Sequence, residues 1–376
     1  MVSFGIKKTI VYSLLPVVVL LPLLEVGCRV VEIWLPPWKV DYGWGFSADS
    51  RLFVPDTGVP GTMITAPPKR ICFKEQVFVL PKASRNFRIF VVGGSSVNYA
   101  EHFINSLGTR LNLLSLGKYE FELINAGGCG YGSHRLVPIV AEVLEYEPDL
   151  ILFYSGHNEF QEIEQLRFVE LRTLPLQKVL YKSALCRFIR DRFASLQLTR
   201  LRRERNQQLL RMTPKDNGSW EEKHFSQEQI DERMRIYEQN LGMIVSLCKA
   251  KKVPIVLSTV PSNLWEPRLD DEEALKHIRT LYARGQYEEG KACAQEALKK
   301  YGRYQACETE NSIIRRLAHE NGVPLADVEA KVIAAEPHQV PGETLFNDWC
   351  HLNPIGNVWM MAAFQEQIVA LLRTPE

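Results

Sequence analysis

Four short segments of the chain carry the residue types that together perform acyl transfer at a serine. A serine hydroxyl is a weak nucleophile at neutral pH, so it needs a base within hydrogen-bond reach and a third group that orients the base. Ser95, His351 and Asp348 have side chains suited to these three roles. Because Asp348 and His351 are three residues apart, the carboxylate can meet one imidazole nitrogen while the other nitrogen faces Ser95.

The same segments supply donors for the oxyanion that such a reaction forms. The loss of one donor to this oxyanion costs on the order of 100-fold to 1,000-fold in rate. We predict three donors: the backbone N–H groups of Ser95 and Gly130, and the side-chain amide of Asn158. A glycine at position 130 also lets the backbone approach closely. The segments read Val-Val-Gly-Gly-Ser-Ser at 91–96, Asn-Ala-Gly-Gly-Cys-Gly at 125–130, Gly-His-Asn-Glu at 156–159 and Asp-Trp-Cys-His at 348–351.

The order and wording of these segments resemble the SGNH (GDSL-like) hydrolase superfamily, from about residue 87 to the end of the chain. By this resemblance, the family's serine, glycine, asparagine and histidine correspond to Ser95, Gly130, Asn158 and His351. The family's aspartate, three residues before the histidine, corresponds to Asp348. The resemblance implies a three-layer α/β/α, flavodoxin-like fold and an ester-bond hydrolase that needs no cofactor.

One departure from the family pattern lies in the first segment. The family commonly has Gly-Asp-Ser, whereas Gly94 precedes the serine here. Ser96 is a rival nucleophile, but alignment with the family segment favours Ser95. The α/β-hydrolase alternative requires Gly-x-Ser-x-Gly, and Val97 occupies the last position of that motif.

Three further polar residues lie near the predicted site. His157 is interpreted as a filler within the Gly-x-Asn segment, and His134 as a residue at the start of a helix. Asn263 follows a predicted strand and faces the same edge of the sheet. It is predicted to contact substrate or to stabilise a loop.

The elements that must position these residues alternate between strand and helix. Runs rich in β-branched and aromatic residues predict strands, and longer amphipathic stretches predict helices. Such alternation indicates a parallel sheet covered on both faces, with Ser95, Gly130 and Asn158 just beyond the carboxyl ends of strands. The predicted strands cover 87–92, 121–125, 149–154, 253–260 and 323–328; the predicted helices cover 135–146, 230–250 and a closing helix after Pro354.

The first 35 residues are predicted to be an N-terminal transmembrane helix. Lys7 and Lys8 precede an apolar run, which places the N-terminus in the cytoplasm and the catalytic domain outside it. The strictly apolar part is shorter than the roughly 20 residues that a bilayer needs, and continuing to Leu35 takes in three charged residues. A cleaved signal peptide and a lipoprotein site at Cys28 are the competing interpretations.

Between this anchor and the catalytic domain, which is predicted over 87–376, residues 36–86 are predicted to form a linker and a wrapping segment. Two inserts interrupt the domain. The insert at 161–229 is basic and helical, and a lid, a lipid-facing helix and a solvated face are its three interpretations. The insert at 269–320 resembles one tetratricopeptide-type hairpin, which must pack on the main domain or on a partner.

Composition narrows the partners. The net charge of +1 gives no overall attraction to nucleic acid. The eight cysteines lack zinc-site spacing, so no metal is predicted, and the glycine-rich segments lack nucleotide-binding spacing. Cys129 and Cys350 each precede a predicted site residue, so the fold would bring their loops together. They could form a disulfide outside the cytoplasm or remain two free thiols, and the sequence leaves both alternatives open.

The sequence therefore predicts a membrane-anchored serine esterase that acts outside the cytoplasm, on O-acetylated polysaccharide or on lipid esters. An O-acyltransferase would use the same residues and pass the acyl group to a sugar hydroxyl. A non-catalytic envelope scaffold is the alternative from a different class, and intact Ser95, Asp348 and His351 argue against it.

Overall fold

The computed structural model describes residues 6–35, 51–165, 180, 182–193, 225–301 and 303–373. The chain divides into two compact units. One combines residues 1–50 with 168–220, and the other combines 51–167 with 221–376. The larger unit holds every predicted site residue, and it begins at Arg51, well before the boundary at residue 87 that the sequence predicts.

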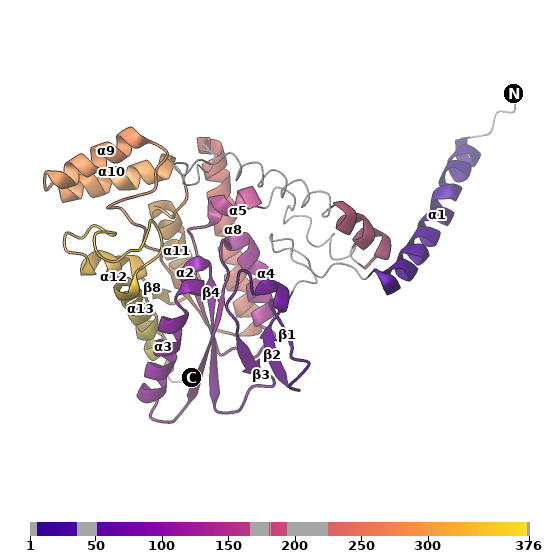
Figure 1. The fold of residues 1–376 in the computed structure, drawn as a ribbon, viewed down its shortest axis with the longest axis horizontal. Helices are drawn as coiled ribbons and strands as arrows, with labels where there is room; N and C mark the ends of the chain where they lie inside the picture. Colours follow the sequence, from indigo (N-terminus) through magenta and orange to yellow (C-terminus); the bar gives the residue numbers. More distant parts are fainter. Residues whose placement is uncertain are drawn as a thin grey trace. The chain divides into compact units, whose positions relative to one another are not determined.

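A five-stranded parallel sheet forms the centre of the larger unit (Figure 1). Its spatial order is β5-β4-β6-β7-β8. Counted along the chain this is 2-1-3-4-5, the flavodoxin-like order, in which the direction of winding reverses between the first and third strands. The predicted fold class and all five predicted strands are confirmed. The strands are β4 (Asn86–Gly93), β5 (Glu120–Gly127), β6 (Leu150–Tyr154), β7 (Ile255–Ser258) and β8 (Leu325–Ala326).

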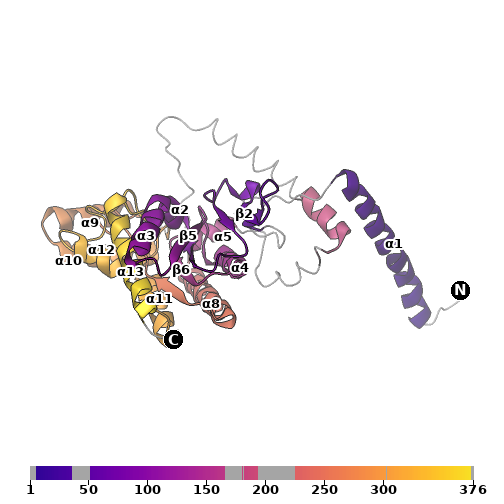
Figure 2. The ribbon, with the colours of Figure 1, turned by 90° about the horizontal axis from the view of Figure 1, so that it is seen from below.

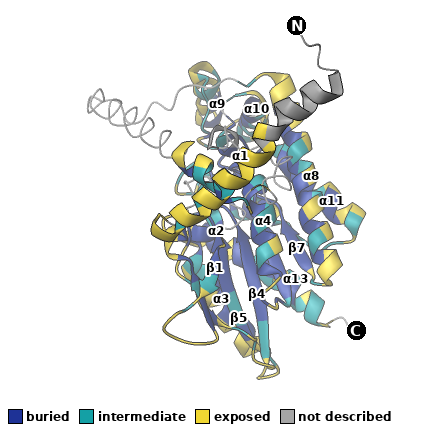
Figure 3. Cartoon of the chain, turned by 90° about the vertical axis from the view of Figure 1, so that its right-hand side faces the viewer, coloured by how far each residue is buried: buried dark blue, intermediate teal, exposed yellow. Residues whose placement is uncertain are grey.

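Helices cover both faces of this sheet, as its apolar strands require. All five residues of β6 are buried, which fits a strand with helices on both sides. The neighbouring strand β7 is also buried throughout (Figure 3). One face is covered by α4 (Ser133–Val143), α8 (Gln227–Lys251) and α11 (Glu308–Asn321). The other face is covered by α3 (Glu101–Leu114) and α13 (Pro354–Arg373), and α12 (Val328–Ala335) packs on α13 (Figure 2).

A second, three-stranded antiparallel sheet lies within the segment predicted as wrapping. It consists of β1 (Phe53–Pro55), β2 (Thr62–Thr65) and β3 (Val77–Val79). Phe53 and Phe78 are buried, and their rings pack edge-on at 5.0 Å. Both rings also contact Phe90 of the main sheet. This small sheet is therefore part of the main hydrophobic core.

The predicted hairpin insert consists of α9 (Glu272–Ala283) and α10 (Tyr287–Lys300). Its apolar side forms a smaller core of its own, in which Ile278 and Leu298 meet Leu264 and Val340. The predicted insert extends to residue 320 and so includes most of α11. In the structure α11 belongs to the main domain instead, because its buried residues pack in the main core. Packing on the main domain therefore accounts for the apolar side of the hairpin.

The smaller unit contains α1 (Ile6–Trp34) and a short helix over 184–193. The Glu25 carboxylate accepts hydrogen bonds from Ser183 Oγ at 2.6 Å and from Ala184 N at 3.0 Å. The Glu32 carboxylate accepts hydrogen bonds from Nε and Nη2 of Arg187, at 2.8 and 2.6 Å. The two acidic residues that interrupt the apolar run, Glu25 and Glu32, thus bind side chains 155 to 158 positions away in the sequence. The predicted basic run at 200–205 lies outside the described residues.

Among the described helices, α13 has the length and apolar composition of a membrane span. However, Met360, Phe364 and Ile368 are buried in the main core, as expected for the core helix of a globular domain. In α1, by contrast, large apolar side chains are exposed: Val18, Leu20 and Leu23 are all more than half exposed.

Candidate active site

Ser95 lies where β4 ends and the short helix α2 (Ser95–Tyr99) begins. The strand run Phe-Arg-Ile-Phe-Val-Val carries the chain to this edge, and Gly94 turns it into the helix. The edge lies between β4 and β6, at the point where the winding direction reverses. Open α/β sheets place their ligand crevices at this position.

The His351 side chain joins Ser95 to Asp348. His351 Nε2 lies 2.8 Å from Ser95 Oγ, and Nδ1 lies 2.6 Å from Asp348 Oδ2. Asp348 Oδ1 also accepts the backbone N–H groups of Cys350 and His351, at 2.9 and 2.8 Å. Both carboxylate oxygens are therefore occupied, which fixes the orientation of the imidazole. The histidine contacts Ser95, the nucleophile that the alignment favours over Ser96.

The local hydrogen bonds decide the charge of Asp348. Burial alone would raise the pKa of this carboxyl, but the bonds from His351 and from two backbone N–H groups lower it to about 2. Asp348 is therefore ionised at neutral pH. An ionised carboxylate holds the proton of the imidazole on Nδ1 and leaves Nε2 free to accept the Ser95 proton.

The Asn158 side chain lies directly against Gly94. Its amide nitrogen donates to Tyr131 O at 3.0 Å, which leaves its second N–H available. A Cβ atom built on Gly94 would lie 2.5 Å from this nitrogen. The glycine thus leaves room for the amide beside the residue that precedes Ser95, and a side chain at position 94 would require Asn158 to move.

The loop that carries Gly130 is attached beside the nucleophile strand. Gly128 N donates to Gly93 O at 2.9 Å, so the end of β5 lies next to the end of β4. Gly130 has a φ of +74°, in the left-handed region that favours glycine. The structure therefore brings this loop and Asn158 to the same edge as Ser95.

A buried ionic network fixes this loop to α5 (Glu159–Gln165), the helix that follows Asn158. Glu162 Oε1 accepts the backbone N–H groups of Gly132 and Arg135, at 3.0 and 3.1 Å, and Arg135 Nε at 2.8 Å. Its other oxygen accepts His134 N and Arg233 Nη2. One carboxylate thus satisfies the free N–H groups at the start of α4.

Glu159, beside Asn158, completes the network. Its carboxylate accepts Ser133 N and Oγ at 2.8 and 2.7 Å, and Arg233 Nη2 at 2.9 Å. Burial raises the pKa of Glu159 to about 7, against the opposing charge of Arg233. For Glu162 burial also acts upward, but Arg135 and Arg233 lower its pKa below the ordinary value. The sequence analysis missed this network, although two acids three residues apart directly after Asn158 were a visible signal.

Asn263 organises the loop that carries Asp348 and His351. Its Nδ2 donates to Asp348 O at 3.1 Å, and its backbone N–H donates to Trp349 O at 3.0 Å. Its Oδ1 accepts Glu266 N at 2.7 Å. The side chain is 7% exposed. Of the two roles predicted for Asn263, these contacts match the stabilisation of a loop.

Of the two additional histidines, His157 is buried and His134 is half-buried. His157 Nδ1 accepts Ala306 N at 3.2 Å, and burial lowers the pKa of this imidazole to about 3. His134 starts α4 beside Asn240, and burial together with Arg233 lowers its pKa to about 4. Both rings are therefore neutral at physiological pH. Neither contacts Ser95.

Tyr99 and two thiols surround His351. The Tyr99 ring lies 5.0 Å from the His351 ring, and its hydroxyl shares a hydrogen bond with the Cys129 thiol. Cys350 Sγ lies 3.6 Å from His351 Nδ1. Cys129 and Cys350 are free thiols here, and burial raises the pKa of both. The side chains of Asp348, Cys350 and His351 lie close enough together to bind a metal ion. However, both ring nitrogens of His351 are already in contact with Asp348 and Ser95.

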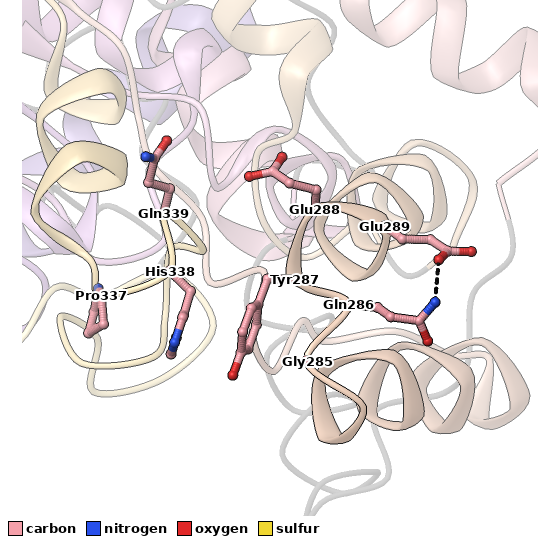
Figure 4. Close-up of a pocket in the computed structure, with 8 residues that line it drawn as sticks. All are labelled: Gly285, Gln286, Tyr287, Glu288, Glu289, Pro337, His338 and Gln339. Carbon is pink, nitrogen blue, oxygen red and sulfur yellow. Dashed lines mark hydrogen bonds between the residues drawn. The ribbon is translucent and has the colours of Figure 1, made fainter.

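An open hollow of about 530 Å³ lies at the hairpin, between the start of α10 and the loop 337–339 (Figure 4). On its wall the Tyr287 ring stacks on His338 at a centroid distance of 3.8 Å. Tyr282 and Trp265 extend the stack inward. The rings thus pin the hairpin to the loop, and the residues that line the hollow include no member of the Ser95 site.

No protein-family model and no curated protein sequence matches the chain. Solved structures similar to it include a GDSL-like lipase from Bacteroides thetaiotaomicron, at 12% identity and a TM-score of 0.39, over 78% of this chain and 93% of that one. An acetyl xylan esterase is 16% identical, with a TM-score of 0.40, over 75% and 99% of the two chains. A variant of a Geobacillus acetyl-xylooligosaccharide esterase is 12% identical, with a TM-score of 0.40, over 75% and 93%. The case for chemistry in this chain rests on the distances within its own site.

Proposed function

We propose that this protein is a serine esterase of the SGNH type. The observation that carries the proposal is the continuous contact from Ser95 Oγ through His351 to Asp348, at 2.8 and 2.6 Å. An ionised carboxylate, an oriented imidazole and a hydroxyl at hydrogen-bond distance form the arrangement that activates a serine.

In the first half of the reaction, Ser95 Oγ attacks the ester carbonyl carbon while His351 Nε2 takes its proton. The carbonyl oxygen gains the negative charge. The amide of Asn158, with the backbone N–H groups of Ser95 and Gly130, stabilises that oxyanion. The intermediate then collapses, the alcohol leaves with the proton from His351, and the acyl group stays on Ser95.

In the second half, water replaces the alcohol. His351 accepts a proton from the water, which attacks the acyl carbon, and the acid leaves as Ser95 regains its proton. If a sugar hydroxyl attacked instead of water, the same residues would perform the acyl transfer that the sequence leaves open. Polysaccharide O-acetyl groups and lipid esters are the two substrate classes that we propose.

The proposed location is a membrane, with α1 as the anchor. A helix of 29 residues is about 43 Å long, enough to cross a hydrocarbon core of about 30 Å. Its described apolar side chains, such as Val18, Leu23 and Val30, are exposed, and the charges of Glu25 and Glu32 are paired with the 183–187 segment at one end. With Lys7 and Lys8 in the cytoplasm, the catalytic unit lies on the other side.

Ester hydrolysis by the full chain in detergent tests the proposal. We expect p-nitrophenyl acetate and longer esters to be cleaved, and Ser95→Ala or His351→Ala to lower kcat by a factor on the order of 10⁴ or more. Ser96→Ala is the matched control and should keep its activity. The dependence on acyl length distinguishes acetylated carbohydrate from lipid esters.

Labelling with a fluorophosphonate probe separates the alternatives. Labelling at Ser95 without ester hydrolysis would favour an acyltransferase that lacks its acceptor. A wild-type protein that is neither labelled nor active would overturn the proposal in favour of a scaffold. For the anchor, extraction of the protein from membranes by alkaline carbonate would contradict a spanning α1.

A further inference from the structure

Arg268 is held between two aromatic rings beside the catalytic loop. Its guanidinium carbon lies 4.3 Å from the centre of the Tyr304 ring and 4.4 Å from that of Trp349. A guanidinium at this distance from a ring centre is attracted to the ring by its positive charge. The two contacts favour one position of the cation, and they do not use its N–H donors as hydrogen bonds.

These donors have no acceptor in the described part of the chain. No carboxylate in the described ranges lies within ion-pair distance of Arg268, and its guanidinium donates no hydrogen bond there. The nearby carboxylate of Glu266 is bound by Arg279 instead. Arginines elsewhere in this unit, such as Arg135 and Arg303, pair with buried carboxylates. Arg268 differs from them in having no ion-pair partner among the described residues.

The charge lies next to the proposed catalytic residues. Trp349, which stacks on Arg268, is two residues before His351. Burial raises the pKa of the neighbouring Cys350 thiol, and the positive charge of Arg268 opposes that shift. Cys350 Sγ in turn lies 3.6 Å from His351 Nδ1. Arg268 is thus within electrostatic reach of the loop that holds the base.

Hydrogen bonds also hold the backbone of Arg268 to the site. Arg268 N donates to Gln305 Oε1 at 3.1 Å, and Gln305 Nε2 donates to Asn263 O at 3.0 Å. Asn263 bonds the backbone of Asp348 and Trp349. Gln305 is almost fully buried, so this chain of contacts is shielded from water. The cation is therefore positioned before any ligand arrives, which reduces the entropy lost on binding.

We propose that Arg268 binds an anionic group, a carboxylate or a phosphate, of the ester substrate; in an acetyl ester this group must lie on the alcohol part. A planar fork of donors suits both groups and can bind them through two parallel hydrogen bonds. This inference rests on the proposed esterase function and narrows its substrate to an acylated alcohol that carries a negative charge. An acylated acidic sugar and an acylated sugar phosphate both meet this description.

Three acetyl esters test the inference with the full chain in detergent: acetylated methyl glucuronide, acetylated glucose 6-phosphate and acetylated methyl glucoside. We expect kcat/KM for at least one charged ester to exceed that for the neutral one by about 10-fold to 100-fold, mainly through KM, as hydrogen bonds to a charged group imply. The charged ester that is preferred identifies the source of the anion.

Arg268→Met keeps an apolar stem between the two rings and removes the charge. We expect this variant to lose the preference, while its kcat/KM for the neutral ester stays within about 2-fold because Ser95, His351 and Asp348 are untouched. Arg268→Lys keeps the charge without the fork and should fall between the two. Arg316→Met is the matched control, because Arg316 pairs with Glu238 at the surface of the helical layer, and it should keep the full preference.

Two outcomes would overturn the inference: equal kcat/KM for charged and neutral esters in the wild type, or an equal loss for all three esters in Arg268→Met. A binding measurement separates this result from failure of the esterase proposal. Calorimetric titration of Ser95→Ala with methyl glucuronide and with glucose 6-phosphate should show binding that Arg268→Met weakens. Binding of the anions without any ester hydrolysis would support the anion site and contradict the esterase function. Ester hydrolysis without anion binding would support the esterase function and contradict the anion site.

Discussion

The two halves of the Ser95 site are held in place by different kinds of interaction. On the oxyanion side, the loop of Gly130 and the helix after Asn158 are joined by Glu159, Glu162 and two buried arginines. On the base side, the loop of Asp348 and His351 is held by neutral contacts from Asn263. Buried ions are costly to separate, whereas neutral hydrogen bonds to the backbone contribute modestly.

This difference indicates how each half responds to damage. A charge network fails as a whole, because the loss of one partner leaves the others uncompensated in the core. A loop held by separate amide contacts can move slightly while the domain stays folded. We therefore expect substitutions on the oxyanion side to lower stability first, and substitutions on the base side to lower kcat with a smaller loss of stability.

The largest effect is expected for Glu162→Ala. The substitution leaves Arg135 and Arg233 without this buried partner and frees the N–H groups at the start of α4, so the free energy of unfolding should fall by about 3–5 kcal/mol. Urea unfolding of the larger unit measures it. Glu238→Ala is the control, since Glu238 pairs with Arg316 at the surface and should cost less than about 1 kcal/mol. Similar losses in both variants would contradict the comparison.

Gly94→Ala tests the oxyanion side without touching the network. The new Cβ would displace the Asn158 amide and lie 3.1 Å from Tyr131 O, so kcat should fall by about 100-fold to 1,000-fold, and the free energy of unfolding should also fall, by less than in Glu162→Ala. Gly108→Ala is the matched control, because a Cβ there would meet Leu123 at an ordinary 3.5 Å. An active Gly94→Ala variant would show that Asn158 is not an oxyanion donor.

Asn263→Ala tests the base side. The loss of the contacts to Asp348 O and Glu266 N should cost about 1–3 kcal/mol of stability. Because the base is then less well positioned, kcat should fall while KM stays unchanged. A higher KM with unchanged kcat would instead assign Asn263 to substrate contact, the other role that the sequence predicts.

The smallest effect concerns pH and His157. The folded state binds a proton on this ring only near pH 3, and the unfolded state does so near 6.5. The unfolded state therefore binds more protons between these values, and the contribution to stability is present above pH 6.5 and is lost as the pH falls. For His157→Asn, the gap in unfolding free energy to the wild type should shrink by about 2 kcal/mol between pH 7.5 and 5.0. If the difference in unfolding free energy between the two proteins is the same at both pH values, His157 is not a group whose protonation affects stability.

The contact between Ser95, His351 and Asp348 could be predicted because the proposed reaction itself restricts these residue types. Ser95, Asp348 and His351 must have these side chains, and a parallel sheet places strand ends at one edge. The buried partners of the site have no such signature. Glu162 and Arg233 are 71 positions apart, and each alone resembles a surface charge on a helix. Their pairing exists only once the helices pack.

The small antiparallel sheet escaped prediction for a different reason. Its strands have only three or four residues, too few to display an alternating pattern. Phe53 and Phe78 are the residues that bind it to the core, and in the sequence they are single aromatics among prolines and glycines. The register that pairs Met63 with Phe78 depends on tertiary packing.

The distance along the chain between nucleophile and base has a consequence for the timing of activity. Ser95 and His351 are separated by 256 positions, and translation proceeds from the first to the second. A chain that is still being synthesised therefore presents a serine with no base beside it. In the proposed mechanism the hydroxyl becomes reactive only when the last part of the domain docks, so the order of synthesis delays the activity until the C-terminal part has folded.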